Sequence, residues 1–226
     1  MNYKHKEAVI MAEKLNLIPS DMLDWLQEKS IDMQRLMTYY KCAMLEVETK
    51  FKVLDAQYSL QHDRNPINSI KTRLKSFSSI VEKLERRGFP FTFESVENNL
   101  NDIAGVRVIC SFVEDVYTLA DALLSQDDVQ LIERKDYVND PKGNGYRSLH
   151  LIVAVPIFLE NEKRMMKVEI QLRTIAMDCW ASLEHQLRYK KDYEFTEESV
   201  AKLYECALLS MKLDEIMDEL RENSNI

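Results

Sequence analysis

The segment RSLHLIVAVPIFLENEKRMMKVEIQLRT, residues 147–174, carries the clearest strand pattern in this chain. Two runs rich in apolar and β-branched residues, RSLHLIVAVPIF and MMKVEIQLRT, are separated by the polar stretch ENEKR. Such runs on either side of a short polar turn are typical of neighbouring β-strands. We therefore predict two strands here, joined by a tight turn.

Further elements are expected on both sides of this segment. The runs IAGVRVICSF (103–112) and VQLIERKDYV (129–138) resemble strands, and VEDVYTLADALLSQ (113–126), between them, has helical spacing. Helices are expected over 175–191 and from about 197 to 220. This order predicts an α+β (mixed α/β) domain with one core, in which a mixed sheet of four or five strands packs against flanking helices.

The first 60 residues or so are expected to be helical, because they hold no glycine and repeat apolar residues at helical spacing. Pro19 and Ser20 interrupt this part, and Ser20 is available to cap the helix DMLDWLQEK. A new helix is expected to start at Asn65 as N-cap, to accept Pro66 in its first turn, and to end at Gly88.

Composition excludes several classes of protein. The 226 residues are 46% hydrophobic and 30% charged, no run approaches the roughly 18 apolar residues of a membrane span, and the start lacks a signal-peptide core, so we expect a cytosolic globular protein. The scattered Cys42, Cys110, Cys179 and Cys206 form no CxxC pair and are expected to be reduced and buried. A net charge of -8 argues against bulk nucleic-acid binding.

Basic residues nevertheless gather in IKTRLKSFSSIVEKLERRG (70–88), which reverses the charge of the chain locally. A solvated helix face is the usual explanation for such a run. Ser76, Ser78 and Ser79 are poor choices for an exposed helix, however, and hydroxyls beside cations suit a bound phosphate.

Two acidic residues are candidate ligands for Mg²⁺. Asp102 stands at the start of a predicted strand, and Glu169 lies two residues from Gln171, so that both project from one face of their strand. A turn residue and a wet strand face are the simpler explanations. If the two carboxylates converge, they supply oxygen ligands of the kind that hold Mg²⁺ together with a substrate phosphate.

The stretch DPKGNGYRSLH (140–150) reads as a glycine-rich hairpin loop followed closely by Tyr146, Arg147 and His150. Tyr146 is placed for base stacking, and the glycines let a ligand approach the backbone. With the basic segment and the two carboxylates, this indicates a Mg²⁺-dependent enzyme acting on nucleotides. Nucleotide binding without chemistry would need the cations but not the acid pair.

The motifs RLKSFSSIVEKLERRG, NDIAGVRV, ERKDYVNDPKGNGYRSLH and VEIQLRTIAMDCWASLEHQLRYK, in this order, closely resemble the synthetase domain of the RelA/SpoT-type alarmone synthetases. The resemblance runs from about residue 46 to 191 and points to a small alarmone synthetase with a nucleotidyltransferase-like fold. It implies transfer of the β,γ-pyrophosphate of ATP to the 3′-hydroxyl of GDP, GTP or GMP, which yields guanosine 3′-diphosphate alarmones of the stringent response and AMP. It also implies three regions: a helical extension (1–45), the catalytic domain (46–191) and a C-terminal amphipathic helix (192–226).

The resemblance assigns a role to each matching position. Asp102 and Glu169 would hold Mg²⁺, and Glu169 would also be the base for the acceptor hydroxyl. The positions assigned to ATP are Arg73 and Arg107, which would stack on adenine, and Lys75, Ser79, Lys83 and Arg87, which would hold its phosphates. The positions assigned to the acceptor nucleotide are Tyr146, which would stack on guanine, with Lys135, Lys142, Arg147 and His150 around the phosphates and ribose. Gln171 would support the same site.

Asp178 matches a position near guanine, where a carboxylate can accept from N1–H and the 2-amino group; decoration of a helix N-terminus is the alternative. The four-residue specificity motif reads Glu133-Arg134-Lys135-Asp136, a mixture of two family versions, which leaves the GDP or GTP preference open. The pair His62-Asp63 spells the HD of the family's hydrolase, but too few histidines remain for that site, so we predict no hydrolysis.

Small members of the family typically form homotetramers through terminal helices. The apolar stripe of Val200, Leu203, Tyr204, Ala207, Leu208 and Met211 suits such an interface, or packing on its own domain. Some relatives bind an alarmone or RNA allosterically, and both stay open here. Rival functions are pyrophosphorylation of tRNA 3′ ends or of adenosine nucleotides, and a catalytically inactive nucleotide sensor.

Overall fold

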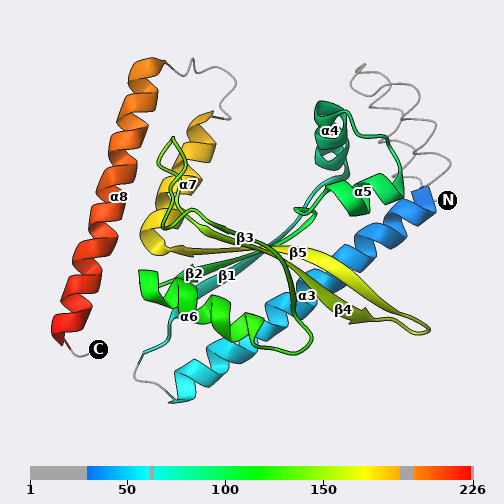
Figure 1. Ribbon diagram of the computed structural model, residues 1–226, viewed down its shortest axis with the longest axis horizontal. Coiled ribbons are helices and arrows are strands. Elements are labelled where there is room, and N and C mark those ends of the chain that lie inside the picture. Colours follow the sequence, from blue (N-terminus) through cyan, green and yellow to red (C-terminus); the bar gives the residue numbers. More distant parts are fainter. Residues whose placement is uncertain (1–29, 62–63, 189–195, 225–226) are drawn as a thin grey trace. The chain divides into compact units, whose positions relative to one another are not determined.

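The computed structural model of the protein describes residues 30–61, 64–188 and 196–224 (Figure 1). The chain forms two compact units, one of Met1–Tyr39 and Ser76–Leu100 and one of Tyr40–Lys75 and Asn101–Ile226. The expected helix after Ser20 and the pair His62-Asp63 lie outside the described residues. None of the helices within those described ranges is both long and apolar enough to cross a bilayer.

The larger unit contains a five-stranded mixed sheet, as the sequence predicts. Its strands follow the order β1-β2-β5-β4-β3. Strands β2 and β5 are parallel, and the other neighbours are antiparallel. The strands are β1 (Ile67–Leu74), β2 (Ala104–Cys110), β3 (Gln130–Asp136), β4 (Leu149–Phe158) and β5 (Lys163–Thr174).

Alternating burial gives the central strand β5 one covered and one polar face. Along β5, Val168, Ile170 and Leu172 are buried while Glu169 and Gln171, which lie between them, are partly exposed. The helices α6 (Val113–Leu124) and α7 (Ile175–Arg188) both pack on β2 and β5. The period of two residues therefore separates core-forming from solvent-facing side chains on the central strand.

The last helix, α8 (Glu197–Ser224), runs back alongside α7 (Figure 1). The indole N–H of Trp180 on α7 donates to the carbonyl of Leu203 on α8 over 2.9 Å. Leu203 and Ala207 are buried there with Trp180. Part of the predicted apolar stripe thus packs on its own domain, whereas Val200, Tyr204 and Leu208 are exposed and Met211 is partly exposed.

The long helix α3 (Ser30–Gln61) confirms the helical expectation for the described part of the N-terminal region. Its second half belongs to the sheet unit, where Lys50 binds Asp128 over 2.6 Å. Of the cysteines, Cys110 is buried as expected, whereas Cys179 and Cys206 are exposed, so the prediction of burial is wrong for those two.

The helix predicted from Asn65 to Gly88 is wrong in its first half, which is the edge strand β1. The side chain of Asn65 accepts from the backbone N–H of Ile67, two residues on, and so opens a strand instead of capping a helix. Pairing of β1 with β2 overrides the helical spacing of this short segment, in which Ile67, Ile70 and Thr72 are β-branched.

The smaller unit contains the rest of that expected helix. Helix α4 (Phe77–Arg87) is capped by Ser76, whose hydroxyl accepts from the N–H of Ser79, and it ends at Gly88 in the left-handed conformation. The end at Gly88 is therefore confirmed. The short helix α5 (Phe93–Asn99), capped by Thr92, was not predicted.

Candidate active site

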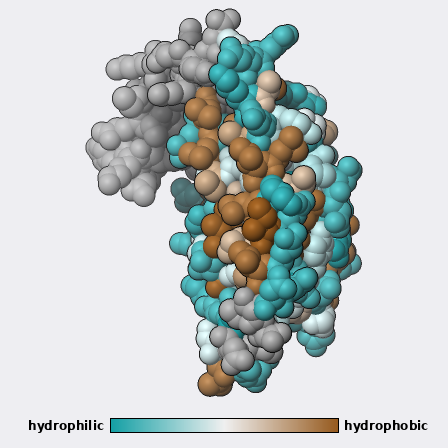
Figure 2. All heavy atoms as spheres, turned by 90° about the vertical axis from the view of Figure 1, so that its left-hand side faces the viewer, coloured by the Kyte–Doolittle hydropathy of each residue, from teal (hydrophilic) through white to brown (hydrophobic). Residues whose placement is uncertain are grey.

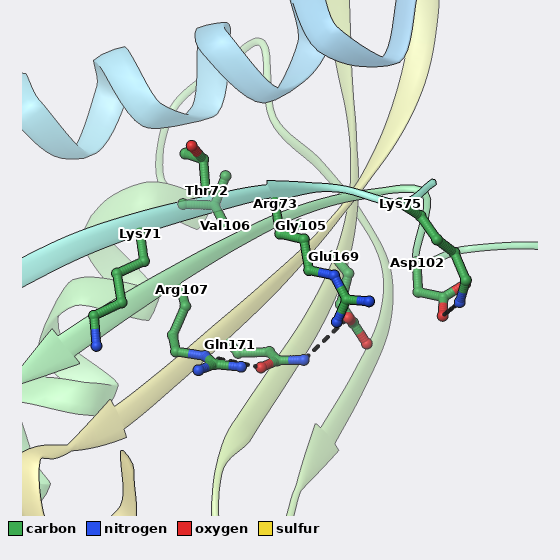
Figure 3. A pocket seen from close by; sticks show the side chains of 10 residues that line it. All are labelled: Lys71, Thr72, Arg73, Lys75, Asp102, Gly105, Val106, Arg107, Glu169 and Gln171. Atoms are coloured by element: carbon green, nitrogen blue, oxygen red, sulfur yellow. Dashed lines mark hydrogen bonds and ion pairs between the residues drawn. The ribbon is translucent and has the colours of Figure 1, made fainter. Parts of the chain in front are cut away.

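A pocket of about 460 Å³ opens on the polar face of the sheet at β1, β2 and β5 (Figure 3). In Figure 3, Thr72 and Val106 point to the opposite side of the sheet from the charged side chains. The lining residues are Lys71, Thr72, Arg73, Lys75, Asp102, Gly105, Val106, Arg107, Glu169 and Gln171. Six of these ten are residues to which the sequence analysis assigns a role: Arg73, Lys75, Asp102, Arg107, Glu169 and Gln171.

Strand register sets the pocket out in two rows across the sheet. Arg73, Gly105 and Glu169 are direct neighbours on β1, β2 and β5. Lys71, Arg107 and Gln171 form the next row on the same face. Because Gly105 has no side chain, the first row is open at its middle, between the cation of Arg73 and the carboxylate of Glu169.

Asp102 and Glu169 line the same pocket, as expected for a carboxylate pair that shares one cation. Lys75 binds Asp102 over 2.7 Å. Within the described residues, no three or more His, Cys, Asp or Glu side chains lie together in a way that could hold a metal ion. Two carboxylates fit Mg²⁺ when substrate phosphates and waters complete the oxygen shell, because Mg²⁺ usually takes one or two protein carboxylates at nucleotide sites.

The surroundings of Glu169 favour its ionised form. Burial alone would raise the pKa of this carboxyl, and the nearby charge of Asp102 acts in the same direction. The hydrogen bond and charge of His150 and the hydrogen bond from Gln171 outweigh both, so that the pKa lies below its usual value. His150 Nδ1 lies 3.5 Å and Gln171 Nε2 lies 3.1 Å from the Glu169 carboxylate.

Tyr146 belongs to a cluster of rings beside this carboxylate. Its hydroxyl shares a 2.7 Å hydrogen bond with Nε2 of His150, and the rings of Tyr137, Tyr146 and His150 meet edge to face. The ammonium of Lys142 lies 4.4 Å from the ring centre of Tyr137 and 4.7 Å from that of Tyr146. Tyr137 was not predicted as a site residue, although it stands next to the motif 133–136.

Asp178, on the first turn of α7, is buried and bound to three cations. One carboxylate oxygen accepts from Lys71 over 3.0 Å, and the other accepts from Arg107 and Arg173 over 3.1 and 3.3 Å. Burial would raise its pKa, but these cations lower it. Asp178 is therefore more than decoration of a helix N-terminus, because it fixes two pocket residues, Lys71 and Arg107.

Arg173 lies on β5 two residues beyond Gln171, and the sequence analysis gave it no role. It is buried, and its guanidinium donates to Ser148, Gln171, Asp178 and the hydroxyl of Tyr146. The sequence signal was present in the spacing of Glu169, Gln171 and Arg173. Arg173 connects the ring cluster around Tyr146 with the ion-pair network around Asp178.

Arg147 differs from its expected position among the acceptor-binding residues. It is buried and binds Asp214 of α8 over 2.8 Å. Gly145 differs in the same way, because its missing side chain faces Ala207 of α8 instead of clearing space for a ligand. We define the segment 137–148 as the β3–β4 loop, and both corrections show that it rests on α8.

The remaining predicted residues lie outside this pocket. Lys135 on β3 is exposed and binds Glu133 over 3.0 Å. Asp136 instead accepts from the backbone N–H groups of Val138 and Asn139 and so shapes the start of the β3–β4 loop. Three predicted phosphate ligands are spaced four residues apart along one stripe of α4, in the smaller unit: Ser79, Lys83 and Arg87.

Comparison with known proteins identifies the family. A model of the region found in RelA/SpoT proteins matches residues 72–194. The chain belongs to the RelA/SpoT family. This confirms the resemblance seen in the motifs of the basic segment, of β2, of the β3–β4 loop and of β5.

Individual relatives within this RelA/SpoT family agree over nearly their whole length. The GTP pyrophosphokinase YwaC of Bacillus subtilis is 43% identical over 86% of this chain and 93% of its own. Small alarmone synthetase 1 of Bacillus subtilis, in a crystal structure bound to its product pppGpp, gives a TM-score of 0.79 at 33% identity over 85% of this chain and 97% of its own. Small alarmone synthetase 2 of the same organism gives 0.77 at 41% identity, over 85% and 99%. The expected α+β synthetase fold is thereby confirmed.

Proposed function

We propose that this RelA/SpoT-family protein is a GTP pyrophosphokinase that transfers the β,γ-pyrophosphate of ATP to the 3′-hydroxyl of GDP or GTP and releases AMP. The observation that carries the proposal is one pocket in which Asp102 and Glu169 face Arg73, Lys75 and Arg107. Cations on a triphosphate and a carboxylate pair at the reacting end are what pyrophosphoryl transfer requires. Relatives named pyrophosphokinase and small alarmone synthetase support it.

Glu169 is the proposed base. As the acceptor 3′-oxygen forms its bond to the β-phosphorus, the bond from that phosphorus to the oxygen bridging to the α-phosphorus breaks, and AMP leaves with the bridging oxygen. The hydroxyl proton passes to Glu169, whose lowered pKa keeps it ionised and ready to accept. His150 and Gln171 orient this carboxylate from the side of the ring cluster.

Mg²⁺ is the proposed cofactor, held by Asp102 and Glu169. When bound, it neutralises charge on the phosphates that react. Lys75, which pairs with Asp102 at 2.7 Å, is then close enough to bind a phosphate of ATP. Stacking of adenine by Arg73 and Arg107, and phosphate binding by Ser79, Lys83 and Arg87, stay predictions from the resemblance.

The acceptor nucleotide is proposed to lie along the ring cluster, with guanine stacked on Tyr146 and its phosphates near Lys142 and Lys135. Tyr146 stands one hydrogen bond away from His150, which is itself 3.5 Å from the proposed base. A guanine stacked on the Tyr146 ring therefore brings the ribose of the acceptor nucleotide toward Glu169. Recognition of guanine by Asp178 stays a prediction, and the carboxylate would have to accept hydrogen bonds from guanine as well as from Lys71, Arg107 and Arg173.

A homotetramer working in the cytosol, with synthesis but no hydrolysis, completes the proposal. An exposed apolar band runs along the outer face of α8 between hydrophilic side chains, which favours assembly through this helix (Figure 2). ATP and GTP are cytosolic metabolites, which suits that location.

The test is transfer of label from γ-labelled ATP in the presence of Mg²⁺. Purified protein is incubated separately with GMP, GDP, GTP, ATP or tRNA, and the labelled product is identified by chromatography and mass. We expect guanosine 3′-diphosphate nucleotides and AMP in equal amounts. Label on tRNA or on adenosine nucleotides would establish a rival reaction, and label found as free phosphate alone would overturn pyrophosphoryl transfer.

A further inference from the structure

The β3–β4 loop touches α8 at a point where no side chain fits. Gly145 has φ 86°, which L-residues rarely adopt. A Cβ added to it would lie 2.4 Å from Cβ of Ala207 and 3.4 Å from the ring of Tyr204. The loop can therefore rest this close to α8 only with glycine at 145 and a small residue at 207.

A buried ion pair fixes the loop two residues further on. Arg147 donates to Asp214 over 2.8 Å, and the two residues are only 9% and 7% exposed. Apolar residues of similar size would fill the same space without the cost of desolvating two charges. What the pair adds is a directional contact, which holds Arg147 to one place on α8.

Tyr146 stands between these two contacts. Its ring packs against the apolar cluster of Trp180, Ala181, Leu203 and Ala207, which α7 and α8 build. On its other side its hydroxyl reaches His150 and Arg173. Helix α8 thus sets the position of the Tyr146 ring in two ways. It contacts the neighbouring residues Gly145 and Arg147, and the ring itself packs against the cluster that includes α8.

We propose that α8 positions the acceptor-binding ring: the contact of Gly145 with Ala207 and the ion pair of Arg147 with Asp214 hold Tyr146 where the acceptor base stacks. Arg147 and Asp214 are then positioning residues that do not touch the substrates. The inference rests on the proposed function, because it takes Tyr146 as the acceptor platform. It goes beyond that function by giving the C-terminal helix a part in acceptor affinity.

Kinetics of matched variants test this. In Gly145→Ala the new methyl group collides with Ala207, and in Asp214→Asn the ion pair is lost while the side-chain size is kept. We expect KM for GDP or GTP to rise about tenfold in each, with KM for ATP within about twofold of wild type. Adding Ala207→Gly to Gly145→Ala removes the collision. In this double variant the increase in log KM for GDP or GTP is expected to be at most half of that in Gly145→Ala.

The controls separate positioning from loss of stability. Ala201→Gly weakens α8 by the same change as Ala207→Gly at an exposed site away from the loop, and is expected to leave both KM values unchanged. Hydrogen exchange offers a readout besides activity. The N–H groups of Lys142 and Gly145, bonded to the carbonyls of Tyr146 and Lys142, are expected to exchange about tenfold faster in Asp214→Asn, while β5 keeps its protection.

The outcomes are distinct. Equal rises in KM for ATP and for the acceptor, no rise in either, or absence of recovery in the double variant of Gly145 and Ala207 would each overturn the positioning role. If Asp214→Asn does not fold, the comparison of Gly145→Ala with the double variant that adds Ala207→Gly is sufficient to test the positioning role. Failure of the proposed function would show instead as a wild-type protein that transfers no pyrophosphate to any guanine nucleotide.

Discussion

Glu169 illustrates how the surroundings of one residue set its chemistry. It lies on β5 directly beside Gly105 of β2, with His150 and Gln171 at its carboxylate. Burial opposes ionisation and the two neighbours favour it, and the neighbours prevail. A carboxylate that stays ionised in a partly buried site is suited to accept a proton from the attacking hydroxyl.

Replacement of Glu169 by Gln is expected to lower kcat for pyrophosphoryl transfer by at least about a thousandfold, because an amide cannot accept the proton. Steady-state rates with ATP and GDP measure this effect, and circular dichroism checks that the fold is intact. Activity within about tenfold of wild type would remove Glu169 as the base.

Replacement of His150 by Gln is expected to move the acid limb of the pH–rate profile to higher pH. The variant loses the hydrogen bond and charge that lower the pKa of Glu169, while burial and Asp102 still raise it. The base form is present above that pKa and is lost as pH falls through it, so a raised pKa narrows the active range from the acid side. His185→Gln, on the exposed part of α7, is the control, and an acid limb that stays in place would contradict the coupling.

Sequence alone identified most of the charged residues in the pocket, because strand alternation put Glu169 and Gln171 on one face and the family resemblance assigned Arg73, Lys75 and Arg107 to ATP. It did not reveal how Arg147 and Arg173 differ. Both are cations near Tyr146 in sequence or space, but one binds Asp214 on α8 and the other binds Asp178 on α7. Such pairings depend on tertiary packing between helices far along the chain, which periodicity does not encode.

Among the elements, α6 is a helix whose first turn is stabilised by a residue from another part of the chain. Arg64, just before β1, binds Asp115 in the first turn of α6 through two hydrogen bonds of 2.6 and 2.8 Å. The same carboxylate accepts from the backbone N–H of Phe112. Asp115 is thus both cap and anchor of the helix that covers β2 and β5.

Replacement of Asp115 by Ala is expected to lower the free energy of unfolding by about 3 kcal/mol, because Arg64 loses its partner in a largely buried place and the helix loses its cap. Urea denaturation followed by circular dichroism measures this. Glu114→Ala is the adjacent control: that side chain is 69% exposed and binds Arg221, so the expected loss is under about 1 kcal/mol. Equal losses in the two variants would argue against the anchor.

Sequence patterns located the described elements except at two places. The segment 67–74 was taken for helix because Asn65 and Pro66 suit a helix start and Gly88 suits a helix end, and only pairing with β2 makes it a strand. Helix α5 is too short for a periodic pattern to appear. Long or strongly alternating elements such as α3, β4 and β5 are specified locally, whereas a short edge strand depends on its neighbour.

In the molecule as a whole, the outer face of α8 carries exposed apolar residues that suit contact with another subunit. Leu209, Leu213, Ile216 and Leu220 are exposed and recur at intervals of four and three residues, the spacing of a coiled-coil seam. This seam lies apart from the buried Leu203 and Ala207. A helix with apolar residues on both sides is expected to pack on its own domain with one side and on another subunit with the other.

Replacement of Leu213 by Lys is expected to reduce the proposed tetramer to smaller species, since a charge in an apolar seam must be desolvated on assembly. Sedimentation velocity at several concentrations measures the assembly state. Lys212→Ala, next to it on the exposed surface, is the control and is expected to leave assembly unchanged. A Leu213→Lys protein with the wild-type sedimentation coefficient would show that this seam is not the interface.

The parallel pairing of β2 with β5 also governs when activity can arise during folding. Asp102 lies just before β2 and Glu169 lies on β5, so the two residues come near each other only when β2 pairs with β5. In the chain, α6, β3 and β4 all lie between these two strands. Closing so long a loop is slow compared with forming helices or the β4–β5 hairpin. We therefore expect the two carboxylates proposed for catalysis to come together late, so that on the ribosome or on refolding a chain with most of its secondary structure is still unable to make an alarmone.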